Sequence, residues 1–177
     1  GLRLADVAER AATSVGSIQH YFRNREGLVA QAQSQRFVEP ARKDITAITE
    51  LFDNAHTVGE LQAALENVTR SVIDRARAPQ RMDRFSSLSA VHGRSGVKAT
   101  MQVEISRLTE EFADAIRSLQ AKGFLRQDVD ATAVSVFVQS YALGMVIADL
   151  VEPACPHEAL ANVVDLFMTS LFPDAAT

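Results

Sequence analysis

The chain has 177 residues, of which 47% are hydrophobic and 23% charged, a composition typical of an ordinary globular protein. Its net charge of −4 gives no overall basic signature for a nucleic-acid partner. Residues 1–43 hold 7 Lys and Arg against 4 acids, or +3, whereas the other 11 basic and 18 acidic residues give −7. This asymmetry fits a protein that contacts a polyanion at one end only.

The single cysteine, Cys155, excludes a disulfide within one chain and a cysteine-based zinc site, which fits a reducing cytoplasm. We see no signal peptide in the sequence. The longest uncharged run, Ala131–Ala148, is bracketed by Asp130 and Asp149 and contains several polar residues. We therefore interpret it as a buried helix and not a membrane span, and we expect a cytoplasmic protein without membrane contact.

Apolar residues recur at helical spacing throughout the chain, and no sustained alternation indicates a strand. We expect short helices at Leu4–Ala11 and Val15–Phe22, and a third that begins after Asn24 and ends at or before Pro40. The remaining helices are expected from about Asp44, as a new helix or an extension, after Thr57 as N-cap, over Met82–Val91, over Val97–Leu119 with a left-handed C-cap at Gly123, over Ala131–Leu150, and over Leu160–Leu171.

The predicted helix Ala131–Leu150 is apolar around most of its circumference, so both of its sides should be buried. A neighbouring subunit is the simplest partner, and we expect a homodimer formed through this helix and Leu160–Leu171. The alternative is that Ala131–Leu150 is the central helix of a monomeric bundle.

The strongest local signal is a helix-turn-helix over Leu4–Phe22. Leu4, Val7 and Ala8 share the inward face of the first helix, and Val15, Ile18 and Phe22 that of the second. Ser14 can cap the second helix. The residues expected to face DNA carry hydroxyl, amide, imidazole and guanidinium groups, or no side chain at all: Ser14, Gly16, Ser17, Gln19, His20, Tyr21, Arg23 and Arg25.

The run Val7–Leu28 reads VAERAATSVGSIQHYFRNREGL, and it resembles the DNA-binding signature of the tetracycline-repressor (TetR) family. That signature places a glycine, a small hydroxyl residue, an aliphatic residue, aromatic or His positions and Phe before a basic-acidic triplet that opens the next helix. The sequence departs from it at Ala12, where glycine is usual, at Thr13, where valine is usual, and at Gln19, where the first aromatic is usual. Ala12 fits the turn only with a negative φ or with mild strain.

The resemblance implies an all-α fold with an N-terminal helix-turn-helix and a helical ligand-binding and dimerisation domain. We expect a DNA-binding domain with its connecting helix over residues 1–40 and an effector-binding and dimerisation domain over residues 41–177. The chain begins about where the family's first helix ends, so we expect residues upstream of Gly1 to complete the DNA-binding domain.

The function that the resemblance implies is a dimeric transcriptional regulator, a repressor released from operator DNA by a small molecule. The alternative is a helical ligand-binding or scaffold protein that does not bind DNA. No paired-His motif, cysteine cluster, phosphate loop or nucleophile elbow is present in the sequence, so we expect no metal, cofactor or enzymatic activity.

An apolar or aromatic effector is expected in the helical domain. The candidate lining residues are bulky apolar side chains with two polar ones among them: Phe85, Leu88, His92, Met101, Ile105, Phe137, Tyr141 and Met145. Each of these is individually more typical of a core residue than of a ligand contact. Buried polar groups such as those of Tyr141 and Gln139 need partners, and a ligand is one option.

Overall fold

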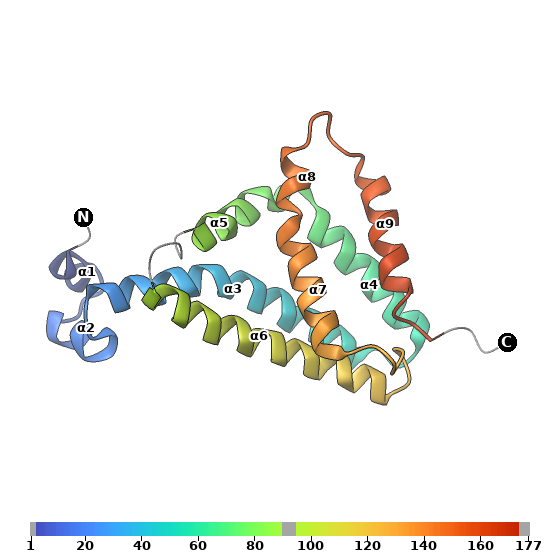
Figure 1. The fold of residues 1–177 in the computed structure, drawn as a ribbon, viewed down its shortest axis with the longest axis horizontal. Helices are drawn as coiled ribbons and strands as arrows, with labels where there is room; N and C mark the ends of the chain where they lie inside the picture. The colour runs from blue at the N-terminus through green and yellow to red at the C-terminus, as the bar shows by residue number, and fades with distance from the viewer. Residues whose placement is uncertain (1–2, 90–94, 174–177) are drawn as a thin grey trace.

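The computed structural model describes residues 3–89 and 95–173, and over these residues it contains helices and no strands (Figure 1). This confirms the predicted all-α class. The elements in chain order are α1 (Leu4–Arg10), α2 (Val15–Phe22), α3 (Arg25–Asn54), α4 (Val58–Ile73), the 3-10 turn η1 (Arg75–Arg77), α5 (Ala78–Ser89), α6 (Ser95–Ala121), α7 (Ala131–Gly144), α8 (Val146–Leu150) and α9 (His157–Thr169).

Several helices begin where the sequence supplies a side-chain cap. Ser14, Asn24, Thr57 and Asp130 each accept a hydrogen bond from a backbone N–H three residues later, at the starts of α2, α3, α4 and α7. After α6, Gly123 has a φ of 73°. The predicted caps at Ser14, Thr57 and Gly123 are thereby confirmed.

The prediction that the third helix ends at or before Pro40 is wrong, because α3 continues through Pro40 to Asn54. Pro40 lacks the N–H that would bond to the Arg36 carbonyl, a loss that usually ends or kinks a helix. Here the apolar stripe of α3 is buried on both sides of the proline, with Phe37, Val38 and Ala41 all below 7% exposure. Burial of this stripe offsets the lost hydrogen bond. The same helix crosses the predicted domain boundary at residue 40.

The main core lies between α3 and α6, which run side by side along most of the molecule (Figure 1). The Phe52 and Phe112 rings stack across this seam with their centroids 6.3 Å apart. The seam is filled by buried apolar residues of both helices: Phe37, Val38, Ala41, Ile45, Ile48 and Phe52 of α3, and Met101, Leu108, Phe112, Ile116 and Leu119 of α6.

The predicted helix Ala131–Leu150 is divided into α7 and α8 at Met145, whose backbone remains helical with φ −59° and ψ −15°. Its path is therefore nearly continuous. The prediction that both sides are buried does not hold within one chain, because Val136, Phe137, Ile147 and Leu150 are exposed. The last helix, α9, begins at His157 and ends at Thr169, slightly earlier than Leu160–Leu171.

Figure 1 shows α1 and α2 at one end of the molecule, beside the N-terminal end of α3. In the helical body, α4 packs on α3 and on α9, and α7 packs on α6. In consequence, α3 is a single helix that joins the small N-terminal unit to the helical body.

Candidate DNA-reading surface and ligand cavity

Ser14 fixes the start of α2. Its Oγ accepts a hydrogen bond from the Ser17 backbone N–H at 3.0 Å and lies 3.0 Å from the Ser17 Oγ. The first-turn amides of a helix have no partners within the helix and form a ready anion site. Because the N-cap residue Ser14 is exposed, the N-terminal end of α2 is accessible to a phosphate.

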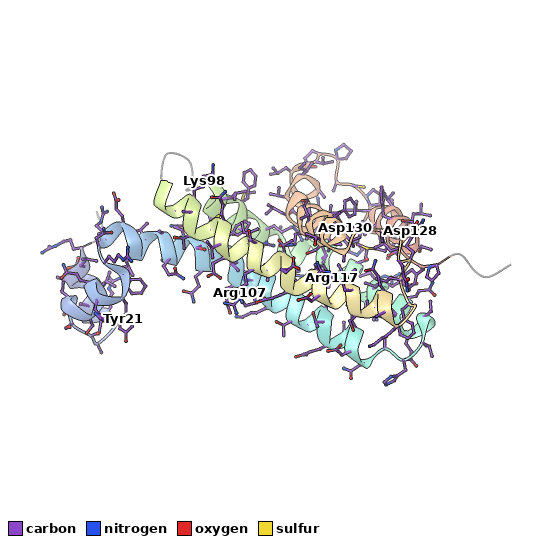
Figure 2. All side chains as sticks on the ribbon, turned by 60° about the horizontal axis from the view of Figure 1, so that its bottom comes forward. Tyr21, Lys98, Arg107, Arg117, Asp128 and Asp130 are labelled. Carbon is purple, nitrogen blue, oxygen red and sulfur yellow. The ribbon has the colours of Figure 1, made fainter. Side chains whose placement is uncertain are left out.

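One face of α2 is buried against the rest of the protein, and the opposite face is exposed to solvent. Ile18 is 4% exposed and packs towards α1, whose Ala8 is 5% exposed. Tyr21 is 79% exposed, and its ring meets that of His20 edge-on with centroids 5.4 Å apart. Figure 2 shows Tyr21 on the N-terminal unit, at the opposite end of the molecule from Asp128 and Asp130.

The predicted DNA contacts lie on α2, at its two flanking turns and at the first residue of α3. All of them are exposed apart from Ser17, which is partly buried: Ser14, Gly16, Ser17, Gln19, His20, Tyr21, Arg23 and Arg25. The structure thus brings these hydroxyl, amide, imidazole and guanidinium groups together at one pole of the chain.

The turn from α2 to α3 depends on Gly27, a requirement that the sequence analysis missed. A Cβ at this position would lie 2.1 Å from the Phe22 carbonyl oxygen. The turn closes because Arg23 takes a positive φ of 63° and the Asn24 Oδ1 accepts from the Gly27 N–H at 2.9 Å. An Asn N-cap followed three residues later by Gly was the only available signal, and it marks the cap without revealing the clash.

The turn between α1 and α2 passes through Ala12, which has a φ of 48°. The left-handed region costs a residue with a Cβ roughly 1–2 kcal/mol. Of the two possibilities for Ala12, the structure therefore has the strained one. This is the position where glycine is usual in the TetR signature.

An apolar cavity lies in the helical body and is open to solvent on one side. Its walls come from α3, α4, α5, α6, α7, α9 and the segments beside them: Ala41, Asp44, Ile45, Ile48, Phe52, Leu65, Val68, Thr69, Val72, Arg84, Phe112, Ile116, Leu125, Val134, Val138, Gln139, Tyr141, Ala142, Met168 and Leu171. The space is narrow and mostly hydrocarbon-lined, as small-molecule sites usually are.

Of the eight candidate lining residues, Tyr141 alone lines this cavity, and Gln139, the other polar residue considered for a ligand contact, lines it as well. Met101 is 2% exposed in the α3–α6 core, and Ile105 packs against the same core. Phe85, Leu88 and Phe137 are exposed, Met145 is partly buried at the α7–α8 junction, and His92 lies outside the described residues. The structure thus spreads these residues over the core, the surface and the cavity and does not gather them at one site.

Two hydrogen-bond donors open onto the cavity. The Tyr141 hydroxyl is buried and has no hydrogen-bond partner among the described residues. Burial raises the pKa of Tyr141 to about 12, with Asp165 adding to the shift and Arg81 opposing it. Burial also lowers the pKa of the Arg84 guanidinium, an effect that Asp44 opposes and Arg77 reinforces. With a pKa of about 12, the Tyr141 hydroxyl keeps its proton at neutral pH, and a guanidinium stays protonated in proteins.

Two other polar residues of this region, Gln139 and Ser135, have partners inside the protein. The Gln139 Nε2 donates to the Thr109 Oγ1 at 3.1 Å, and the Ser135 Oγ donates to the Thr109 carbonyl at 2.8 Å. These bonds join α7 to α6. The amide nitrogen of Gln139 is thus already used within the fold.

A set of exposed apolar side chains on α7, α8 and α9 forms what we term the C-terminal apolar surface: Val136, Phe137, Ile147, Leu150, Val163, Leu166 and Phe167. Phe137 and Phe167 connect α7 to α9, with ring centroids 5.7 Å apart. The stretch Ala131–Leu150 is long and apolar enough to cross a membrane, and 17% of its most apolar window is buried within the chain. One such helix is weak evidence for a membrane span, because helices that pack on other protein pass the same test.

Within the part of the chain that the structure describes, no group of three or more His, Cys, Asp or Glu side chains could hold a metal ion. Cys155 is exposed and free.

Comparison with known proteins identifies the N-terminal unit. Residues 1–32 match the family of bacterial regulatory proteins, tetR family. No curated protein matches the chain significantly.

Two solved structures share the fold. One is a Rhodococcus sp. protein assigned to the TetR family of transcriptional regulators, which is 17% identical with a TM-score of 0.63, over 97% of this chain and 88% of that one. The other, from Rhodococcus sp. RHA1, is assigned as a transcriptional regulator and is 18% identical with a TM-score of 0.57, over 98% of this chain and 87% of that one. The predicted resemblance to the TetR family is thereby confirmed.

Proposed function

We propose that this chain, which carries the TetR-type DNA-binding segment and has the fold of TetR-family regulators, is a homodimeric transcriptional regulator that binds operator DNA. The observation that carries the proposal is α2. Its Ile18 side is buried, while Gln19, His20 and Tyr21 project from an exposed helix whose N-terminal end is open to phosphate. A second helix presented in this way is what enters the major groove in helix-turn-helix proteins.

We assign the DNA contacts to two classes. Gln19 is suited to a bidentate contact with adenine, since its amide both donates and accepts. Ser14, Ser17, Tyr21, Arg23 and the capped helix end are suited to phosphate. Residues 1–40 would act as the DNA-binding domain with its connecting helix, and residues 41–177 as the effector-binding and dimerisation domain.

The C-terminal apolar surface supports dimerisation through the helices Ala131–Leu150 and Leu160–Leu171. Leu166 is 73% exposed, and Ile147 and Leu150 are each 67% exposed, in a single chain. Contiguous exposed apolar side chains of this kind mark interaction surfaces. For two copies of α2 to enter successive major grooves, a twofold axis there must place them about 34–36 Å apart.

The apolar cavity supports a small-molecule effector, and α3 connects it to α2. An effector that binds better to the conformation unsuited to DNA would release the protein from its operator by shifting the population. The regulator would then act as a repressor in the cytoplasm, without enzymatic activity. The second candidate function, a ligand-binding protein that does not contact DNA, is favoured by the cavity alone.

Fluorescence anisotropy with duplexes from the region upstream of the protein's own gene tests the proposal. We expect specific binding that weakens steeply with salt concentration, because phosphate contacts release counterions. Gln19→Ala should lower specific affinity by roughly tenfold, or about 1.4 kcal/mol. Gln102→Ala, an exposed glutamine on α6, is the matched control and should bind normally. Binding that is absent at all salt concentrations, or equal for every duplex, would leave the ligand-binding alternative.

A further inference from the structure

The walls of the cavity restrict what can fill it. Ile45 and Ile48 of α3, Val68 of α4 and Phe112 of α6 give hydrocarbon surface from several sides. A molecule with many polar groups would lose its hydration there without compensation. The body of the bound molecule must therefore be apolar.

Three arginines gather beside this cavity on η1 and α5. Arg77 contacts the Asp44 carboxylate at 2.5 Å, and Arg81 contacts that of Asp149 at 2.6 Å. Arg81 also donates to the carbonyls of Val72 and Asp74, so its guanidinium is fully occupied. Both aspartates are thus committed to the other two arginines.

Arg84 is the third. Its Nε donates to the Phe37 carbonyl at 3.3 Å, and its Cζ lies 5.0 Å from the centroid of the Phe37 ring. Among the described residues no carboxylate pairs with it, and neither terminal nitrogen makes a hydrogen bond. Arg84 lines the cavity and is partly buried, and its pKa is lowered mainly by desolvation. A desolvated guanidinium with two open nitrogens is a strong site for a planar oxyanion.

Tyr141 adds a second donor from α7. Its buried hydroxyl is unpartnered among the described residues, and with a pKa of about 12 it remains protonated. Each donor has one acidic and one basic neighbour, Asp165 and Arg81 for Tyr141 and Asp44 and Arg77 for Arg84. Of the two donors only Arg84 carries a positive charge, so the negative charge of a ligand is better placed there, and Tyr141 can donate to a neutral oxygen of the same molecule.

Resting on the proposed function, we infer that the effector is an amphiphilic carboxylate, with its apolar body in the cavity and its carboxylate on the Arg84 guanidinium. Arg84 also couples this site to the DNA-reading unit, because its present contact is Phe37, one turn before Pro40 in α3. A carboxylate that draws the guanidinium from Phe37 removes a support of α3 where its own hydrogen bonding is weakest.

Calorimetric titration of the protein with n-decanoate and with 1-decanol tests the inference, because the two probes differ in charge and share an apolar chain. We expect decanoate to bind at least about tenfold more tightly than decanol, as charge-assisted hydrogen bonds allow. Arg84→Met should lower decanoate affinity by a similar factor and leave decanol unchanged, and Arg84→Lys should keep part of it. Arg107→Met, which removes an exposed arginine on α6, is the matched control.

Three results would overturn the inference. The first is that neither probe binds, and the second is that decanol binds as tightly as decanoate. The third is that the Arg84→Met variant binds decanoate like the unchanged protein while its circular dichroism shows a normal fold. The coupling has its own readout, since decanoate should lower operator affinity of the unchanged protein and not that of Arg84→Met. Failure of the proposed function is distinct, because decanoate would then still bind a protein that has no specific affinity for DNA.

Discussion

Gly16 is the second residue of α2, directly after the Ser14–Val15 start of the helix. A Cβ there would meet only the Ser14 Oγ, at an ordinary 3.7 Å. The fold of the free chain therefore does not require glycine at this position. Close approach of the α2 backbone to DNA in the proposed complex would account for it.

Gly16→Ala should raise the free energy of unfolding by up to about 1 kcal/mol, because alanine is the better helix former. The same change should weaken operator binding by roughly tenfold, since a methyl group would stand between helix and duplex. Gly59→Ala is a matched control, because Gly59 is the second residue of α4 after a Thr57 cap and has nothing within 4 Å. Urea denaturation and anisotropy would separate the effects, and equal operator affinity for Gly16→Ala would refute the close approach.

Substitution of Gly27 by alanine should destabilise the fold, whereas the same substitution at Gly16 should stabilise it. Gly27→Ala forces a Cβ to within 2.1 Å of the Phe22 carbonyl oxygen, so the turn between α2 and α3 must shift. We expect a loss of about 1–3 kcal/mol of stability together with weaker DNA binding. Gly96→Ala at the start of α6 has open space and serves as the control. A thermal melting temperature that is unchanged by Gly27→Ala would contradict this reading of the turn.

Among the elements, α5 is held to its neighbours by the buried pair Arg81–Asp149, whose side chains are 7% and 8% exposed. The Arg81 guanidinium bonds the carboxylate on α8 and two carbonyls at the end of α4. The pair therefore joins α5, the helix that carries Arg84, to α8, one of the helices of the C-terminal apolar surface.

Arg81→Met should cost about 3–5 kcal/mol, because it leaves the Asp149 carboxylate buried without its partner. Arg107→Met breaks an exposed pair with Glu111 and should cost no more than about 1 kcal/mol. Chemical denaturation of both variants measures the difference. Equal losses would mean that the buried pair has no special structural role.

The helices and their caps could be predicted from the sequence because they depend on residues within a turn or two along the chain. The Thr57 start and the Gly123 end are such local features. The passage of α3 through Pro40 could not be predicted, since it depends on burial against α6, which is distant in the sequence. The cavity depends on the packing of several helices, so periodicity identified Tyr141 as a polar residue on an apolar face and could not single out Arg84.

For the whole molecule, the C-terminal apolar surface makes a prediction about assembly. Leu166→Glu should shift the protein towards monomer in sedimentation equilibrium at micromolar concentration, because a charge would be buried in the proposed interface. Val103→Glu is the matched control, since Val103 is 67% exposed on α6. A monomeric unchanged protein, or a Leu166→Glu variant that dimerises normally, would refute the proposed interface.

Because α3 is one unbroken helix, a small rotation of its N-terminal half would displace α2 by a large distance. From Arg25 to Pro40 the helix advances about 22 Å at 1.5 Å per residue, so a bend at Pro40 would act through a stiff segment of that length. A tilt of about 10° at that bend would swing α2 by about 4 Å, more than the ~3.4 Å between successive base pairs along one strand. A change in the contacts of Phe37 no larger than a bond length would then take α2, the proposed recognition helix, out of register with a major groove.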